Sequence, residues 1–199
     1  MRGLHRKLFV SIVSSAQVRM IHEKNYLYYM PIFPALTEDI PVLVALMDSA
    51  YRGEESKKGW TSEADLLLGE KRTDETIVAN LMQNPGAVFL KYINDDEKIE
   101  GCVFLRKEEK KLYLGMLCVS PLAQAKGIGK QLMNQAEEYA RQIDCTSVYM
   151  SVISIRQELI AWYERKGYMK TGETKPFPVD ERFGIPVQPL EFFILEKIL

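Results

Sequence analysis

The residue pattern with the clearest chemical meaning is a glycine-containing loop at residues 124–130. Two glycines allow a ligand to approach the backbone without a Cβ in the way. The unpaired N–H groups of a first helical turn, with the helix dipole behind them, bind anions such as phosphates. The loop therefore predicts a site for a phosphate-bearing ligand, although a G-x-G sequence alone is also typical of a tight strand-to-helix turn. The loop consists of Gln124, Ala125, Lys126, Gly127, Ile128, Gly129 and Lys130.

Other phosphate and metal motifs do not fit the sequence. The loop lacks the Gly-Lys-Ser/Thr ending of a Walker A motif and has only a fragment of the dinucleotide fingerprint. A kinase-like enzyme, which would bind ATP with Mg²⁺, is disfavoured for that reason and because Asp-rich metal ligands are missing. Cys102, Cys118 and Cys145 form no CxxC pair, which argues against a disulfide framework or a structural zinc site. We expect buried thiols, a reducing compartment and no metal.

Periodicity and turn residues predict the elements that position this loop. Apolar residues at helical spacing predict helices over residues 37–51, 62–68, 73–83, 128–143 and 155–166. Runs of β-forming residues predict strands over residues 26–33, 87–93, 99–107, 110–119, 146–152, 168–174 and 191–197. Residues 52–59 and 176–189 read as loops. The order of helices, a three-stranded meander and then alternating strands and helices predicts an α/β (α+β) fold with one parallel crossover.

Composition narrows the class of protein further. The chain has 199 residues, of which 47% are hydrophobic and 27% charged, which suits one well-packed domain. Its 26 basic and 27 acidic residues give a net charge of -1, so nucleic-acid binding is disfavoured. No apolar run approaches the ~20 residues that cross a bilayer. We expect a cytoplasmic protein that binds neither nucleic acid nor membrane.

Residues 1–25 are expected to lie outside the fold as an N-terminal extension, leaving one domain over residues 26–199. This stretch is basic, with Arg2, Arg6, Lys7 and Arg19, and its first acid is Glu23. It is consistent with a targeting segment or with an extension from a start codon upstream of the natural one.

Two motifs together resemble the GCN5-related N-acetyltransferase (GNAT) superfamily. Its central pattern, Gln/Arg-x-x-Gly-x-Gly/Ala after a strand ending in Val, is similar to Gln124-x-x-Gly127-x-Gly129 following Val119. Its second signature resembles residues 161–168, in which Tyr163 lies four residues before a glycine. Residues 51–53 and 59–61 resemble the acceptor-side region of some members. The resemblance covers residues 28–199.

The resemblance implies a mixed, mostly antiparallel sheet of six to seven strands flanked by helices, with acetyl-CoA as the acyl donor. The pyrophosphate would meet the backbone N–H groups of the 124–130 loop. The pantetheine arm would pair with the strand edge in the manner of an added strand. That edge comprises Leu117, Cys118 and Val119. A backbone N–H near Val119 would stabilise an oxyanion. Tyr163 would act as general acid, whereas its residue type alone suggests a tyrosine packed on a helix face.

The acceptor side is less defined. Many members carry a Glu on the fourth strand, but residues 112–119 contain no carboxylate, so the sequence does not identify a general base. A water chain, or a carboxylate such as Glu54, Glu63 or Glu191, is left open as a substitute. Tyr51 and Trp60 are expected to border an acceptor pocket, with core packing as the alternative for Tyr51. Arg156 suits either a ligand contact or a surface ion pair. The loop at residues 176–189 is a candidate cover for the acceptor site.

Taken together, the sequence predicts an N-acetyltransferase that acetylates a primary amine, of a small molecule or a protein, by direct attack. Cys118 is a possible nucleophile in principle, but a strand-end position suits backbone pairing better. A catalytically inactive acyl-CoA sensor of the same fold is the alternative. A monomer and a homodimer are both compatible with the sequence.

Overall fold

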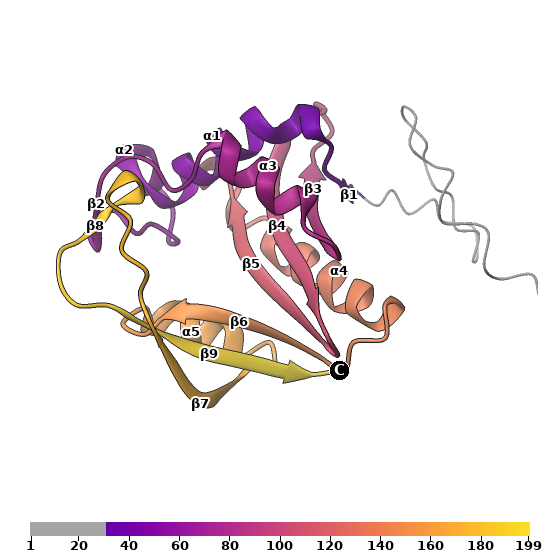
Figure 1. Cartoon of the computed structure of the whole chain (residues 1–199). Coiled ribbons are helices and arrows are strands. Elements are labelled where there is room, and N and C mark those ends of the chain that lie inside the picture. The colour runs from indigo at the N-terminus through magenta and orange to yellow at the C-terminus, as the bar shows by residue number, and fades with distance from the viewer. Residues whose placement is uncertain (1–30) are drawn as a thin grey trace, which may run out of the picture. The chain divides into compact units, whose positions relative to one another are not determined.

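The computed structural model describes residues 31–199, and Figure 1 shows the arrangement of their helices and strands. The α-helices are α1 (Ile40–Tyr51), α2 (Gly53–Ser56), α3 (Glu75–Gln83), α4 (Ile128–Gln142) and α5 (Gln157–Glu164). The strands are β1 (Ile32–Pro34), β2 (Leu67–Leu68), β3 (Ala87–Ile93), β4 (Ile99–Glu108), β5 (Lys111–Val119), β6 (Ser147–Ile153), β7 (Met169–Pro176), β8 (Ile185–Pro186) and β9 (Glu191–Ile198). Three 3-10 turns lie at Thr37–Asp39, Pro121–Ala123 and Glu181–Phe183.

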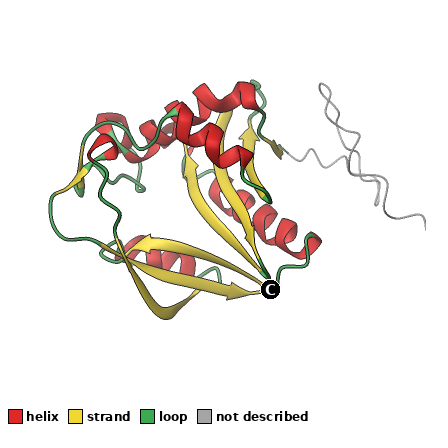
Figure 2. Ribbon diagram, viewed as in Figure 1, coloured by secondary structure: helices red, strands yellow, loops and turns green. Residues whose placement is uncertain are grey.

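Seven strands form one mixed sheet in the order β1-β3-β4-β5-β6-β9-β7. Every neighbouring pair is antiparallel except β5 and β6, which run parallel. A parallel pair needs a long crossover, and α4 supplies it between these two strands (Figure 2). The predicted mixed, mostly antiparallel sheet with one parallel crossover is confirmed.

Helices cover both faces of this sheet, because its strands carry apolar residues on both sides. On one face, α1 and α3 pack against β3, β4 and β5 around buried residues such as Leu43 and Phe104. On the other face, α4 packs against the same strands around Leu105 and Leu132. Tyr163 belongs to the second cluster, on the α4 side of the sheet.

The start of α4 is determined by two glycines. Gly127 forms the N-cap of α4. Its φ of 81° lies in the left-handed region, which residues with a side chain rarely adopt. Gly101 on β4 lies beneath the helix, where an added Cβ would come within 2.9 Å of Ile128 Cγ2 and 3.0 Å of Leu132 Cδ1. The absence of a side chain at Gly101 therefore lets α4 approach the sheet closely.

Several predicted elements differ from the observed ones. The expected helix over residues 62–68 is wrong: Leu67 and Leu68 form β2, which pairs with β8, because burial of Leu67 outweighs local helical spacing. The expected loop at residues 52–59 contains α2, and the loop at residues 176–189 contains β8. Of the strand expected at residues 26–33, only the end lies in the described part. The expected extension at residues 1–25 falls outside it. No helix within residues 31–199 is long and apolar enough to cross a membrane.

Candidate active site

The two central strands of the sheet separate soon after they pair. β5 and β6 are in register only from Lys111 with Ser147 to Tyr113 with Tyr149. Further along β5, Met116 has a φ of 49°, and the register with β4 shifts between Cys102 and Phe104. Such a bulge bends a strand and increases its twist. The result is a strand edge on β5 that has no neighbouring strand within the described residues.

The backbone groups on this free edge can be assigned from the alternation of a strand. The N–H of Ser120 donates to the carbonyl of Glu100 on the β4 side, at 2.8 Å. Because successive residues point their backbone groups to opposite sides, those of Leu117 and Val119 point away from β4, toward the opening. Cys118, between them, is paired with Cys102 of β4, so its backbone groups point toward β4.

A cavity of about 330 Å³ lies at this opening and brings most of the predicted site residues together. It is lined by Tyr51, Trp60, Thr61, Leu117, Val119, Gln124, Ala125, Gly127, Ile128, Gly129, Lys130, Leu159, Trp162, Tyr163 and Lys166. Two predicted residues are not part of this lining. Lys126 is exposed, and the buried thiol of Cys118 lies 3.4 Å from that of Cys102. Cys118 packs in the α1 and α3 cluster, on the other face of the sheet.

The 124–130 loop presents its backbone to the cavity. Ala125 and Gly127 both have left-handed φ values, of 68° and 81°, which turn the chain sharply into α4. Within the described range no side chain caps the first turn of this helix. The uncapped N–H groups and the helix dipole therefore make this wall of the cavity suitable for an anionic group, and Lys130 adds a positive charge.

The side chain of Gln124 is already engaged by other protein groups. Its Oε1 accepts a hydrogen bond of 3.0 Å from the N–H of Trp60. Its Nε2 donates to Thr61 Oγ1 at 3.0 Å and to the carbonyl of Val119 at 3.3 Å. The Gln124 amide is therefore not free to contact an anion, which leaves the loop backbone and Lys130 for that contact.

Tyr163 is a buried residue of α5 whose ring lies against two other aromatic rings. Its centroid is 5.1 Å from that of Trp162 and 6.1 Å from that of Tyr168. Burial raises the pKa of Tyr163 well above its usual range, and the positive charge of Arg156 acts in the opposite direction. The phenol is therefore protonated at neutral pH and is a proton donor rather than an acceptor.

Tyr51 approaches the same cavity from the last turn of α1. Its hydroxyl donates a hydrogen bond of 2.6 Å to the carbonyl of Leu117, on the free edge of β5. Burial raises the pKa of Tyr51 as well, so this phenol also stays protonated. The guanidinium of Arg72 lies 5.6 Å from the centre of the Tyr51 ring.

No carboxylate lines this cavity among the described residues. Glu54 pairs with Lys57 on the surface at 2.7 Å, and Glu63 pairs with the buried Arg52. Glu191 is exposed at the start of β9. None of these three acids, which the sequence left open as possible bases, reaches the cavity wall.

The sequence missed three lining residues on α5 and in the turn directly after it. Leu159, Trp162 and Lys166 face the cavity together with Tyr163. Their spacing of three and four residues from one another places them on one helix face. That spacing is a signal from which they could have been found once Tyr163 was singled out.

Comparison with known proteins places this geometry in a family. A sequence model described as "Acetyltransferase (GNAT) family" matches residues 46–168, more than half of the 199-residue chain. The chain belongs to this family. The first turn of α4 and Tyr163, which both line the cavity, lie within the matched residues.

Individual relatives of this family member are distant. Acetyltransferase Atu2258 of Agrobacterium fabrum is 30% identical over 83 residues, covering 42% of this chain and 59% of the relative. The chain spans between half and three fifths of the length of the curated relatives that it matches.

Solved structures share the fold at low sequence identity. Ribosomal-protein-alanine N-acetyltransferase from Brucella melitensis superposes with a TM-score of 0.62 at 19% identity, over 84% of this chain and 99% of the other. The PaiA N-acetyltransferase of Thermoplasma acidophilum, solved in complex with coenzyme A, gives 0.59 at 19% identity, over 84% and 98% of the two chains. At this identity the likeness concerns the fold alone.

Proposed function

We propose that this chain is an acetyl-CoA-dependent N-acetyltransferase that acetylates a primary amine by direct attack on the thioester. The observation that carries the proposal is that one cavity is lined both by the uncapped first turn of α4 and by the buried, protonated Tyr163. The family match and the coenzyme A bound in a structural neighbour support acyl-CoA as the donor.

The described residues fit such a donor. The N–H groups of residues 124–130 and the charge of Lys130 would hold the pyrophosphate. Gly129 lines the same cavity, where an added Cβ would make only an ordinary van der Waals contact of 3.7 Å with Val119 Cγ2. The free edge of β5 at Leu117 and Val119 would pair with the amide-containing arm. The carbonyls of these two residues already accept hydrogen bonds from Tyr51 and Gln124, so the arm would have to replace those donors to use them. The donor supplies an activated acetyl thioester.

The chain's own groups then assist the transfer. The N–H of Val119 points toward the opening and would stabilise negative charge on the thioester oxygen as the amine adds. As the C–S bond breaks, Tyr163 would donate its proton to the departing thiolate. The excess proton of the attacking amine passes to water, since no carboxylate lines the cavity within residues 31–199. The acceptor is a small-molecule or a protein amine, and we place the protein in the cytoplasm as a monomer or homodimer.

The test combines binding and turnover. Titration calorimetry with acetyl-CoA should show one site per chain, and a panel of primary amines should include one that is acetylated with release of free thiol. Absence of acetyl-CoA binding would overturn the proposal.

The lack of a carboxylate in the cavity lining within residues 31–199 also supports a second candidate function, because it leaves no carboxylate side chain there to act as general base. A catalytically inactive acyl-CoA sensor would bind acetyl-CoA but release no thiol with any amine of the panel. Binding without turnover would favour the sensor, and turnover with even one amine would exclude it.

A further inference from the structure

Two side chains from opposite sides of the opening hold a short segment of the chain between them. We call this segment, Trp60 and Thr61, the strap. Arg156 Nη2 donates to the carbonyl of Trp60 at 2.9 Å, and Arg156 Nη1 donates to the carbonyl of Thr61 at 3.2 Å. From the other side, Gln124 bonds the N–H of Trp60 and the hydroxyl of Thr61, each at 3.0 Å.

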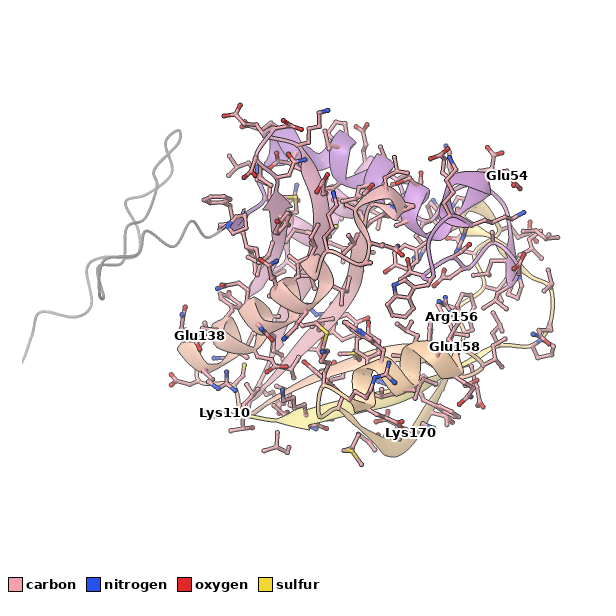
Figure 3. The ribbon with its side chains drawn as sticks, turned by 180° about the vertical axis from the view of Figure 1, so that it is seen from behind. Glu54, Lys110, Glu138, Arg156, Glu158 and Lys170 are labelled. Atoms are coloured by element: carbon pink, nitrogen blue, oxygen red, sulfur yellow. The ribbon has the colours of Figure 1, made fainter. Side chains whose placement is uncertain are left out.

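The two anchors come from the two strands that separate at the cavity. Gln124 follows β5, and Arg156 follows β6, directly before α5. Figure 3 shows Arg156 beside α5, on the same side of the molecule as Glu54 of α2. The strap therefore joins the ends of β5 and β6 at the place where these strands no longer pair with each other.

The fit between strap and anchors is close. A Cβ on Gly59 would come within 2.6 Å of Gln124 Nε2, so a side chain before the strap would have to displace the Gln124 amide from its hydrogen bonds to the strap. The indole of Trp60 lies edge-on to that of Trp162, with centroids 5.8 Å apart. Trp60 also lines a second, polar cavity of about 490 Å³, whose lining includes Lys57, Asp65, Arg156 and Glu158. Trp60 thus forms the partition between the two cavities.

The hydrogen-bond partners of Arg156 indicate a positioning role. Its hydrogen bonds within the described part of the chain go to two neutral backbone carbonyls and none goes to a carboxylate. A guanidinium offers two parallel N–H donors in a fixed geometry, which suits two successive carbonyls better than a lysine does. A surface ion pair, the simpler expectation from the sequence, is not formed within residues 31–199.

We propose that Arg156 is a positioning residue that latches the strap across the opening between β5 and β6, so that bound acyl-CoA is enclosed until the strap opens. The proposal rests on the proposed function for the identity of the ligand. Its geometric part, that Arg156 holds the strap closed, does not depend on the proposed function. The positive charge of Arg156 also lowers the pKa of Tyr163, against the effect of burial. Arg156 therefore lies close to the proposed acid.

The chain provides its own probe for this latch, because its two tryptophans, Trp60 and Trp162, both line the cavity. We would measure the dissociation rate of coenzyme A by stopped-flow tryptophan fluorescence in the wild type and in Arg156→Met. Loss of both charged hydrogen bonds should accelerate dissociation about 10-fold or more. Arg156→Lys, which can restore one donor, should give an intermediate rate. Arg141→Met, at the exposed end of α4, is the matched control and should dissociate like the wild type.

A ligand-independent measurement separates the latch from the proposed function. In a Trp162→Phe background, acrylamide should quench the fluorescence of Trp60 more strongly when Arg156 is replaced by Met. Gln124→Leu releases the strap from its other anchor and serves as the second variant if Arg156→Met fails to fold. Unchanged quenching in a folded variant would overturn the latch, even if coenzyme A binds. Failure of the wild type to bind coenzyme A, with increased quenching in the variant, would overturn the proposed ligand and leave the strap contact standing.

Discussion

The hydroxyl of Tyr51 donates a hydrogen bond of 2.6 Å to the carbonyl oxygen of Leu117, and this bond ties the last turn of α1 to the free edge of β5. The same carbonyl points toward the opening, where the proposed acyl donor would pair with β5. A donor that uses this carbonyl therefore has to compete with Tyr51 for it.

Replacing Tyr51 by Phe should expose this competition. Loss of the hydroxyl leaves the Leu117 carbonyl without its donor and should lower the free energy of unfolding by about 1 kcal/mol. Saturating coenzyme A should then raise the melting temperature of Tyr51→Phe by more than it raises that of the wild type, since an amide N–H of the ligand can replace the lost donor. Differential scanning fluorimetry measures both shifts, with Tyr139→Phe on α4 as the control. Equal ligand-induced shifts in all three proteins would contradict the competition.

Replacing Tyr163 by Phe should reduce turnover without weakening donor binding. Removal of a general acid typically costs a factor of about 10² or more in rate. The kcat for the best amine should fall by at least about 100-fold, and the dissociation constant of acetyl-CoA should change little, because the phenyl ring preserves the packing against Trp162 and Tyr168. Tyr92→Phe on β3 is the matched control. A Tyr163→Phe enzyme with wild-type kcat would remove the acid role.

The pH dependence of kcat follows from the direction of the Tyr163 shift. Burial raises the pKa of Tyr163 above its ordinary value of about 10, so the proton needed for the acid role is present throughout the neutral and mildly alkaline range. We expect kcat to rise with pH as the acceptor amine loses its proton, and to show no descending alkaline limb up to about pH 10. A pH–rate profile with a saturating amine checks this. A fall between pH 8 and 9.5 that disappears in Tyr163→Phe would mean that the phenol ionises too readily.

Replacing Cys118 by Ala should leave the reaction intact. Its buried thiol lies beside Cys102 on the α1 and α3 face and not in the cavity, so it has no access to a thioester there. We expect kcat within about 3-fold of the wild type, which is close to 0.7 kcal/mol, and a stability loss of about 1 kcal/mol from the small cavity created. Detection of an acetylated Cys118 by mass spectrometry during turnover would contradict direct attack.

Glycines 101 and 129 should respond in opposite ways to substitution by Ala. A Cβ at Gly101 would meet Ile128 and Leu132 at 3.0 Å or less, so α4 has to shift and stability should fall by about 1–3 kcal/mol. At Gly129 the nearest atoms would be 3.7 and 3.9 Å away, so the gain in helix propensity should raise stability by up to about 1 kcal/mol. Urea unfolding of both variants checks this pair. A stable Gly101→Ala protein would mean that α4 does not need its close approach to β4.

The sequence by itself determined the features that depend on neighbouring residues in the chain. Gly127 and the repeat of apolar residues after it defined the start and the buried face of α4, because left-handed backbone and helical periodicity are local properties. The β-forming runs with polar breaks likewise defined the meander of β3, β4 and β5. The strand, the loop after it and the helix that follows were therefore predictable as local elements, and the phosphate-binding role of the loop stays a prediction.

Only the tertiary structure decided how these parts meet. The bulge at Met116 frees the β5 edge, Leu67 pairs in β2 instead of continuing a helix, and Trp60 lies between Gln124 and Arg156. Each of these outcomes depends on contacts between residues far apart in the chain, where burial and hydrogen bonding outweigh local preference. From the sequence, Arg156 suited either a ligand contact or a surface ion pair. Only in the folded chain does Arg156 donate hydrogen bonds to the carbonyls of Trp60 and Thr61, which lie 96 and 95 residues away in the sequence.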